Sequence, residues 1–383
     1  MHRTSMKSFF LFPAFAFFQF TICYAQVNKS VRSDNKLRSR LDSAVNKAAI
    51  IYMQDSNANG ISIGICWHGK KYSYNYGEVK KGTGILPTAD NFYNLGSVAK
   101  TFVATMLAEA VVEKKANLDD DIRKFLPGKY PNLEYHGHGI ELVNLANHTS
   151  GLPAEFQNLS ASARDSIKRM SLPQQVDFYS RYTADSLLSD LHHVKLDTMP
   201  GAQFHYNSNA MMLLILLLER IYHQPYEQIV TDYLKKQLEM YDTRTVLSKE
   251  DMKRLAQGYD SKNQPQQYAN FKSYTGGPSM NSTVNDMLKY IQANLSEKDK
   301  AIWLTHQLTW GKKDGSGLGL GWMMDTENGI RYIYHDGNTK IGFNTLCLFY
   351  PDKGLGYIII VNDNISQRRV GDIENNITQQ LLK

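Results

Sequence analysis

Residues 94–102 read Asn-Leu-Gly-Ser-Val-Ala-Lys-Thr-Phe and lead into an apolar segment, Val-Ala-Thr-Met-Leu-Ala-Glu-Ala-Val-Val at 103–112. A helix that is apolar on nearly every side is usually buried, so this stretch predicts a core helix around which the fold is built. Ser97 is expected to cap the positive end of that helix, with Lys100 on the same face near a dry interior. Burial lowers the pKa of a lysine, and a neutral amine can take the proton of a neighbouring hydroxyl. The pair therefore has the pattern of a Ser-x-x-Lys nucleophile.

The Ser-x-x-Lys spacing is a weak signal by itself. Ser33 and Lys36 have the same spacing in a polar stretch with no other sign of function. The ordinary interpretation of such a pair is a first-turn serine and a surface lysine. The rest of the sequence must decide between these interpretations.

The N-terminus has the pattern of a secretory signal peptide. Arg3 and Lys7 precede an apolar run, and Cys23-Tyr24-Ala25 offers small residues at the cleavage positions, so we predict a signal peptide over residues 1–25. A retained anchor or a lipoprotein attached through Cys23 are the alternatives, but the run is shorter than the ~20 residues of a spanning helix. The expected location is periplasmic or secreted, with no stable membrane span after cleavage.

Charge and cysteine content exclude several classes of function. The net charge of +6 is mild, and no dense basic block with interleaved aromatic residues indicates nucleic-acid binding. Cys66 and Cys347 could form one bridge, but their apolar strand contexts equally suit buried free thiols, which we expect. The histidine pairs at 136/138 and 192/193 lack a third ligand at supporting spacing. We therefore expect no metal and no cofactor.

Hydrophobic periodicity predicts strands near both ends of the chain and helices between them. The expected helices cover 33–54, 211–218, 225–238, 284–295 and 373–382, and the expected strands cover 61–67, 72–76, 329–334, 342–350 and 354–362. This order predicts an α/β (α+β) fold, an antiparallel sheet flanked by helices and built from both termini, with an inserted all-helical domain. The predicted boundaries are 26–125 plus 271–383 for the sheet domain and 126–270 for the helical domain, with the active site between them.

Three later stretches accompany the Ser97 motif in a recognisable order. They are Leu-Ala-Asn-His-Thr-Ser-Gly-Leu-Pro at 145–153, Pro-Gly-Ala-Gln-Phe-His-Tyr-Asn-Ser-Asn at 200–209 and His-Asp-Gly-Asn-Thr-Lys-Ile-Gly-Phe at 335–343. Together they resemble the serine β-lactamase-related hydrolases, in the branch of class C β-lactamases, D,D-peptidases and esterases. The resemblance covers roughly residues 61–362 and implies a β-lactamase/transpeptidase-like fold. It also implies that the loop at 148–151, which includes His148, is structural and has no chemical role.

The resemblance assigns a role to each catalytic position. Ser97 corresponds to the nucleophile, and Lys100 and Tyr206 to the residues that move protons. A nearby cation could lower the pKa of Tyr206 enough for it to act as a base or an acid. His335 stands where the family has a lysine or histidine on an edge strand, and it would complete the proton network or hold the electronegative end of the substrate.

The positions that would recognise the substrate depart from the family pattern. The backbone amides of Ser97 and Asn338 would form the oxyanion hole, and Gly337 would let the substrate backbone lie close to the strand. Ser208 replaces the asparagine that contacts the substrate amide, unless Asn207 or Asn209 takes that role. Asp336 replaces a threonine, and its carboxylate would repel a substrate carboxylate unless it points away.

These residues predict a secreted serine hydrolase that acts on a small-molecule amide or ester through an acyl-enzyme on Ser97, with a cell-wall peptide as one candidate substrate. D,D-peptidase, esterase and β-lactamase-like activities all fit. One alternative is a non-catalytic protein that binds penicillin or a cell-wall fragment. Another is an acyltransferase, which would use the same residues.

Overall fold

Strands from both ends of the chain meet in one antiparallel sheet. The computed structural model describes residues 30–268, 274, 277–312 and 315–382, so the predicted signal peptide lies outside the described residues. The strands are β1 (Gly60–Trp67), β2 (Lys70–Gly77), β3 (Tyr93–Asn94), β4 (Glu134–Tyr135), β5 (His138–Gly139), β6 (Asn281–Ser282), β7 (Trp310–Gly311), β8 (Gly317–Leu318), β9 (Met323–Glu327), β10 (Ile330–Asn338), β11 (Asn344–Tyr350) and β12 (Leu355–Val361). The order in the large sheet is β2-β1-β12-β11-β10-β9-β8-β7. In it β1, near the start of the chain, pairs with β12, near its end. The prediction of an antiparallel sheet flanked by helices is confirmed.

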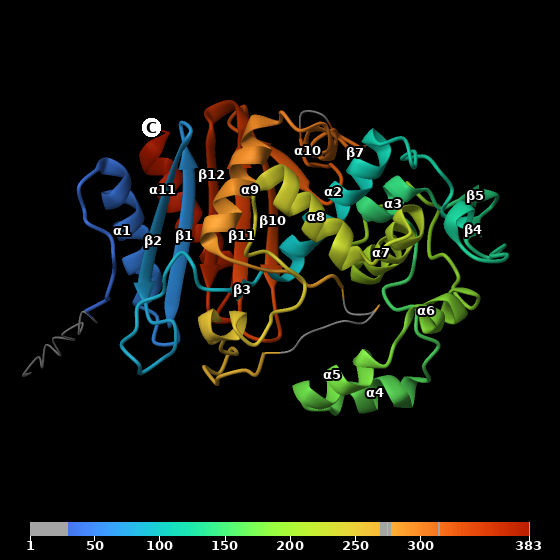
Figure 1. The fold of residues 1–383 in the computed structure, drawn as a ribbon, viewed down its shortest axis with the longest axis horizontal. Helices are drawn as coiled ribbons and strands as arrows, with labels where there is room; N and C mark the ends of the chain where they lie inside the picture. Colours follow the sequence, from blue (N-terminus) through green and yellow to red (C-terminus); the bar gives the residue numbers. More distant parts are fainter. Residues whose placement is uncertain (1–29, 269–273, 275–276, 313–314, 383) are drawn as a thin grey trace, which may run out of the picture. The chain divides into compact units, whose positions relative to one another are not determined.

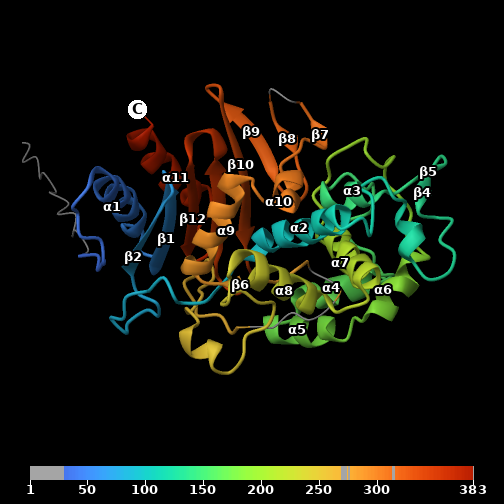
Figure 2. The same ribbon diagram turned by 45° about the horizontal axis from the view of Figure 1, so that its top comes forward.

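Helices cover both faces of this sheet (Figure 1). They are α1 (Arg40–Met53), α2 (Ala99–Val112), α3 (Leu142–Ala146), α4 (Ala161–Arg169), α5 (Leu172–Ser180), α6 (Ala184–Leu191), α7 (Ser208–Tyr222), α8 (Tyr226–Leu238), α9 (Val284–Ser296), α10 (Lys300–Thr305) and α11 (Gln367–Leu381). Two hydrophobic cores result. One holds α1 and α11 against one face of the sheet. The other joins α9 and α2 on the opposite face to the helices α3, α5, α6, α7 and α8 (Figure 2).

The first helix is shorter than predicted. It starts at Arg40 rather than near residue 33, because the Ser39 side chain accepts from the backbone of Asp42 and the Asp42 side chain accepts from the backbone of Ser39. Such a reciprocal capping box satisfies backbone N–H groups of the first turn and so marks the start of the helix. The closing helix α11 is instead longer than predicted and begins at Gln367.

The predicted core helix is confirmed, but its start differs from the prediction. Ser97 lies in a short 3-10 turn, η1 (Gly96–Val98), and the cap position of α2 is Val98, with no side-chain cap hydrogen bond. Ser97 therefore does not cap α2. Gly96, the first residue of this turn, adopts φ 55°, a left-handed conformation that glycine tolerates.

The strands β7 to β9 escaped the sequence prediction, and they limit where β10 is paired. β9 pairs with β10 from Ile330 as far as Tyr334, while β11 pairs with β10 on the other side up to Asn338. From His335 onward, β10 is therefore not paired with β9 on that side. This edge lies against η1.

The helical segment follows the prediction in its main elements. The apolar run at 211–218 lies in the buried helix α7, and α8 follows it closely. Residues 31–383 form one compact unit, and the boundaries predicted for two domains stay a prediction. In the part of the chain that the structure describes, every helix is too short or too polar to cross a membrane.

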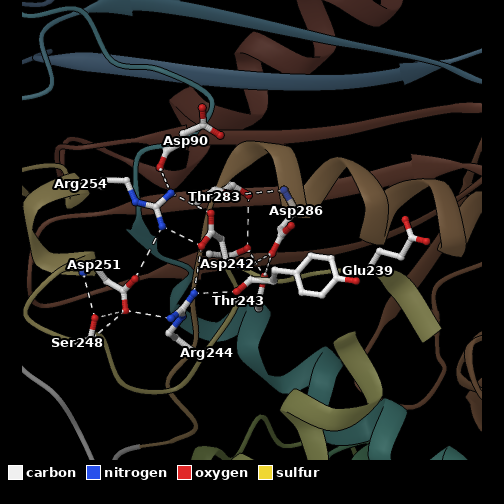
Figure 3. A network of polar contacts seen from close by, with 12 residues as sticks. Asp90, Glu239, Asp242, Thr243, Arg244, Ser248, Asp251, Arg254, Thr283 and Asp286 are labelled. Carbon is white, nitrogen blue, oxygen red and sulfur yellow. Dashed lines mark hydrogen bonds and ion pairs between the residues drawn. The ribbon is translucent and has the colours of Figure 1, made fainter. Parts of the chain in front are cut away.

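A network of ion pairs ties the segment after α8 to the start of α9 (Figure 3). The Arg254 guanidinium donates to both carboxylate oxygens of Asp242 at 2.8 Å, and Arg244 donates to Asp251 at 3.0 Å. The buried carboxylate of Asp286 accepts from the backbone N–H of Asp242 at 2.6 Å. Because each arginine of the network is paired with a carboxylate, we interpret the network as a structural link between these segments.

Candidate active site

Ser97 and Lys100 are in direct contact. Nζ of Lys100 lies 2.9 Å from Oγ of Ser97, as expected for two residues on one helical face. Lys100 is 2% exposed, because α2 is surrounded by apolar side chains. The contact gives a proton a direct path from hydroxyl to amine.

Burial decides the protonation of Lys100. It lowers the pKa of the amine from 10.5 to about 7, and the Asp336 carboxylate acts in the opposite direction. A lysine with this pKa is partly neutral at physiological pH and can serve as a base. The sequence prediction of a lysine with a lowered pKa is confirmed.

Tyr206 lies beside the same amine. Nζ of Lys100 is 4.9 Å from the centre of the Tyr206 ring. Burial raises the pKa of Tyr206 to about 12, although hydrogen bonding to Ser97 lowers it. The expectation of a lowered tyrosine pKa is therefore wrong, because loss of hydration outweighs the neighbouring groups. Tyr206 is neutral at physiological pH and suits a donor or a proton relay better than a base.

His335 is buried next to Tyr206. The ring centres of the two residues are 6.2 Å apart. Burial, with the charge of Lys100, lowers the pKa of His335 to about 3. The imidazole is thus neutral, so it cannot supply positive charge to an electronegative group of a substrate.

The end of β10 approaches η1 very closely. A Cβ on Gly337 would lie 2.1 Å from the carbonyl oxygen of Leu95 and 3.1 Å from the amide nitrogen of Ser97. A Cβ on Gly96 would lie 2.9 Å from the amide nitrogen of Asn338. The structure therefore brings together the two amides expected to form the oxyanion hole. Gly337 is needed for contact with the chain's own backbone, a reason that the sequence did not reveal.

The structure separates the roles of the three polar residues at the start of α7. The Asn207 side chain accepts from the amides of Asn209 and Ala210 and donates to the carbonyls of Leu152 and Pro153. Its capacity is used in capping α7 and holding the preceding loop. The Asn209 amide donates to Ala154 at 2.6 Å.

Ser208 is the residue of this group that lines a cavity beside the nucleophile. The cavity has a volume of about 370 Å³. It is lined by Asn94, Gly96, Ser97, Lys100, Leu172, Gln175, Tyr179, Ser208, Gly277, Pro278, Ser279, Asn338, Thr339, Lys340 and Ile341. Its charged lining side chains are two lysines. Asp336 lies outside this lining, and burial raises the pKa of its carboxyl group.

Sequence reasoning missed two contributors to this region. Lys340 lines the cavity and donates to Gln175 on α5 at 2.9 Å, a contact between segments far apart in the chain. His148 lies behind Tyr206, with ring centres 4.6 Å apart. The motif at 145–153 contained His148, but nothing in the sequence indicated which aromatic ring it would contact.

Metal binding has no support within the described residues. No three His, Cys, Asp or Glu side chains there gather closely enough to hold an ion.

Comparison with known proteins agrees with the fold. A β-lactamase/D-alanine carboxypeptidase from Yersinia pestis, solved with citrate, superposes with a TM-score of 0.76 at 22% identity, covering 90% of this chain and 99% of the other. A structure described as a class C β-lactamase superposes with a TM-score of 0.74 at 22% identity, covering 90% and 97%. The fold is therefore of the β-lactamase/transpeptidase-like class.

Sequence similarity defines the family. The model of the Beta-lactamase family matches residues 45–380, and the chain belongs to this family. A β-lactamase of Pseudomonas fluorescens is 25% identical over 350 residues, 82% of this chain and 90% of the relative. The D-alanyl-D-alanine-carboxypeptidase/endopeptidase AmpH of Escherichia coli K12 is 27% identical over 327 residues, 80% of each.

Proposed function

We propose that this chain is an exported serine hydrolase that cleaves an amide or ester through an acyl-enzyme on Ser97. The observation that carries the proposal is the 2.9 Å contact between Ser97 Oγ and the buried amine of Lys100. The pKa of about 7 for that amine supports its role as the base. Family membership supports the reaction class.

The first half of the reaction forms the acyl-enzyme. Neutral Lys100 takes the proton of Ser97 as Oγ attacks the carbonyl carbon, and the amides of Ser97 and Asn338 stabilise the oxyanion. The tetrahedral intermediate collapses as the proton moves from Lys100, through the Tyr206 hydroxyl, to the leaving nitrogen or oxygen. In the second half a water molecule loses a proton by the reverse path, attacks the acyl carbon and releases the acid, which restores Ser97.

The substrate is proposed to be a D-amino acid peptide, a small ester or a β-lactam. The printed activities of the relatives, β-lactamase and D-alanyl-D-alanine carboxypeptidase/endopeptidase, support this range. The neutral His335 favours a peptidase or esterase, because the site lacks a permanent positive charge at that position.

The proposal is tested with the chain lacking residues 1–25 and its Ser97→Ala variant. Each is incubated with a penicillin, a short-chain nitrophenyl ester and a D-Ala-D-Ala peptide, and adduct mass and product are followed. We expect adducts or products that require Ser97. A persistent penicillin adduct would indicate a peptidase, and rapid release a β-lactamase. If no reaction in the panel depended on Ser97, the hydrolase proposal would be wrong.

A further inference from the structure

His148 is joined to both chain neighbours of Tyr206. Its carbonyl oxygen accepts from the backbone N–H of His205 at 2.8 Å, and its ring Nδ1 accepts from the backbone N–H of Asn207 at 3.3 Å. His148 is 4% exposed, and its ring is tilted by 45° against the Tyr206 ring. Phe204 packs edge-on against the imidazole, with ring centres 6.2 Å apart. His148 thus contacts the backbone on both sides of Tyr206 as well as its ring.

The hydrogen bond to Asn207 determines the tautomer of His148. A backbone N–H only donates, so Nδ1 of His148 must carry the lone pair. Burial and the nearby charge of Lys100 hold the pKa of His148 well below its usual value, so the ring is neutral. Its single proton is therefore on Nε2.

His335 has the opposite tautomer. Its Nδ1 lies 2.6 Å from the carbonyl oxygen of Asp336. A carbonyl only accepts, so Nδ1 carries the proton and Nε2 the lone pair. At Nε2, therefore, neutral His148 carries a donor and neutral His335 an acceptor, and both rings lie next to Tyr206.

Both Nε2 atoms are buried and have no hydrogen-bond partner among the described residues. A buried donor or acceptor without a partner costs about 1–3 kcal/mol. A single water molecule could accept from Nε2–H of His148 and donate to Nε2 of His335, since buried waters characteristically pair such groups. The Tyr206 ring lies in contact range of both imidazoles.

We propose that His148 is a positioning residue for Tyr206, linked through one bridging water to His335. The backbone partners at Nδ1 set the tautomer of each imidazole, and the link between the two rings holds the Tyr206 ring beside Lys100. This inference rests on the proposed function for its effect on turnover, but not for the tautomers themselves. It assigns a role to the loop at 148–151 that the family resemblance treats as purely structural.

Three variants test the role of His148. His148→Asn keeps an acceptor near the position of Nδ1 and suits the φ of 60° at this residue, but it removes the Nε2 donor. His148→Gln restores an N–H group at about the reach of Nε2. His223→Asn is the matched control, because His223 is an exposed histidine with φ 54° at the end of α7.

Nitrogen-15 NMR of the histidine side chains gives a readout that does not depend on activity. We expect wild-type His148 protonated on Nε2 and His335 on Nδ1, both neutral at pH 7. In His148→Asn the Nε2 signal of His335 should shift, and His148→Gln should move it back. His223→Asn should leave it unchanged.

Kinetics give the second readout. With a substrate that the Ser97 test identifies, His148→Asn should lower kcat about tenfold with little change in KM, as for loss of one oriented hydrogen bond. His148→Gln should recover most of the rate. The opposite tautomer in His148, or a His335 signal identical in wild type and His148→Asn, would overturn the proposal. A drop in thermal stability with unchanged kcat would also overturn it. If the wild type turned over no substrate, the proposed function would fail while the NMR result still decided the tautomers.

Discussion

At the scale of single residues, hydration decides the proton chemistry of the site. Burial lowers the pKa of Lys100 to about 7 and raises that of Tyr206 to about 12. In both cases it disfavours the charged form, the ammonium of the lysine and the phenolate of the tyrosine. The amine therefore becomes the better base, and the phenol stays protonated. His335 is neutral for the same reason.

The pH dependence of the reaction tests this arrangement. The proposed mechanism requires the neutral amine of Lys100, so kcat/KM should rise with pH through an apparent pKa near 7. The Asp336 carboxylate stabilises the ammonium form, so Asp336→Asn should lower the pKa of Lys100 and move the acid limb to lower pH.

Measurement of kcat/KM between pH 5 and 9, roughly the range of interest around neutrality, would check both expectations. Asp325→Asn is a suitable control, because this carboxylate on β9 lies on the strand neighbouring Asp336 but has no part in the Lys100 shift. A limb that moved to higher pH in Asp336→Asn would contradict the assignment of the base.

At the scale of elements, the site depends on the close approach of β10 to the turn that carries Ser97. β9 stops pairing at Tyr334, which leaves room for η1 beside the last residues of β10. Gly337 permits the contact because a side chain there would overlap the backbone of Leu95. Sequence periodicity predicted a strand here, but the free edge depends on where its neighbour ends.

Gly337→Ala should therefore displace η1 or unfold the region. The added Cβ would lie 2.1 Å from the Leu95 carbonyl, and we expect a loss of about 3 kcal/mol or more in the free energy of unfolding. Gly371→Ala is the control, because it lies inside α11 with open space around it and should be neutral or stabilising by up to ~1 kcal/mol. Urea unfolding of both variants measures the difference. An equally stable Gly337→Ala protein would show that the approach is looser than described.

At the scale of the whole molecule, helices bury both faces of the sheet, and two cysteines on its central strands are buried with it. Cys66 on β1 pairs with Gly356 of β12, and Cys347 on β11 pairs with Ile358 of the same strand. β12 therefore separates the two thiols, which are both free and buried. Burial raises the pKa of the Cys66 thiol to about 11, and that of Cys347 is raised as well.

Thiol counting tests this arrangement. The chain without residues 1–25 should show two reactive thiols per molecule after denaturation without reductant, and almost none when folded. Replacing Cys66 by serine should leave one thiol in the denatured chain, which serves as the calibration. A denatured chain without free thiols would mean that the two cysteines are bridged.

Local pattern in the sequence was enough to predict the main strands, the longer helices and the core helix after residue 98, while the family resemblance predicted the grouping of Ser97, Lys100, Tyr206 and His335. These features repeat every few residues or lie in ordered motifs. The sequence missed β7 and β8 because each is only two residues long, too short to show a period, and it also missed the five-residue β9. It also predicted the wrong direction for the pKa of Tyr206.

The tertiary structure alone decided the pKa values, the division of roles between Asn207 and Ser208, and the contact of His148 with Tyr206. A pKa depends on every group that excludes water from a side chain, and a tautomer depends on the partner of each ring nitrogen. Those groups come from segments far apart in the chain, as for Asp336 and Lys100. The sequence therefore determined which residues are proposed to carry the chemistry, and the packing of distant segments determined their protonation states.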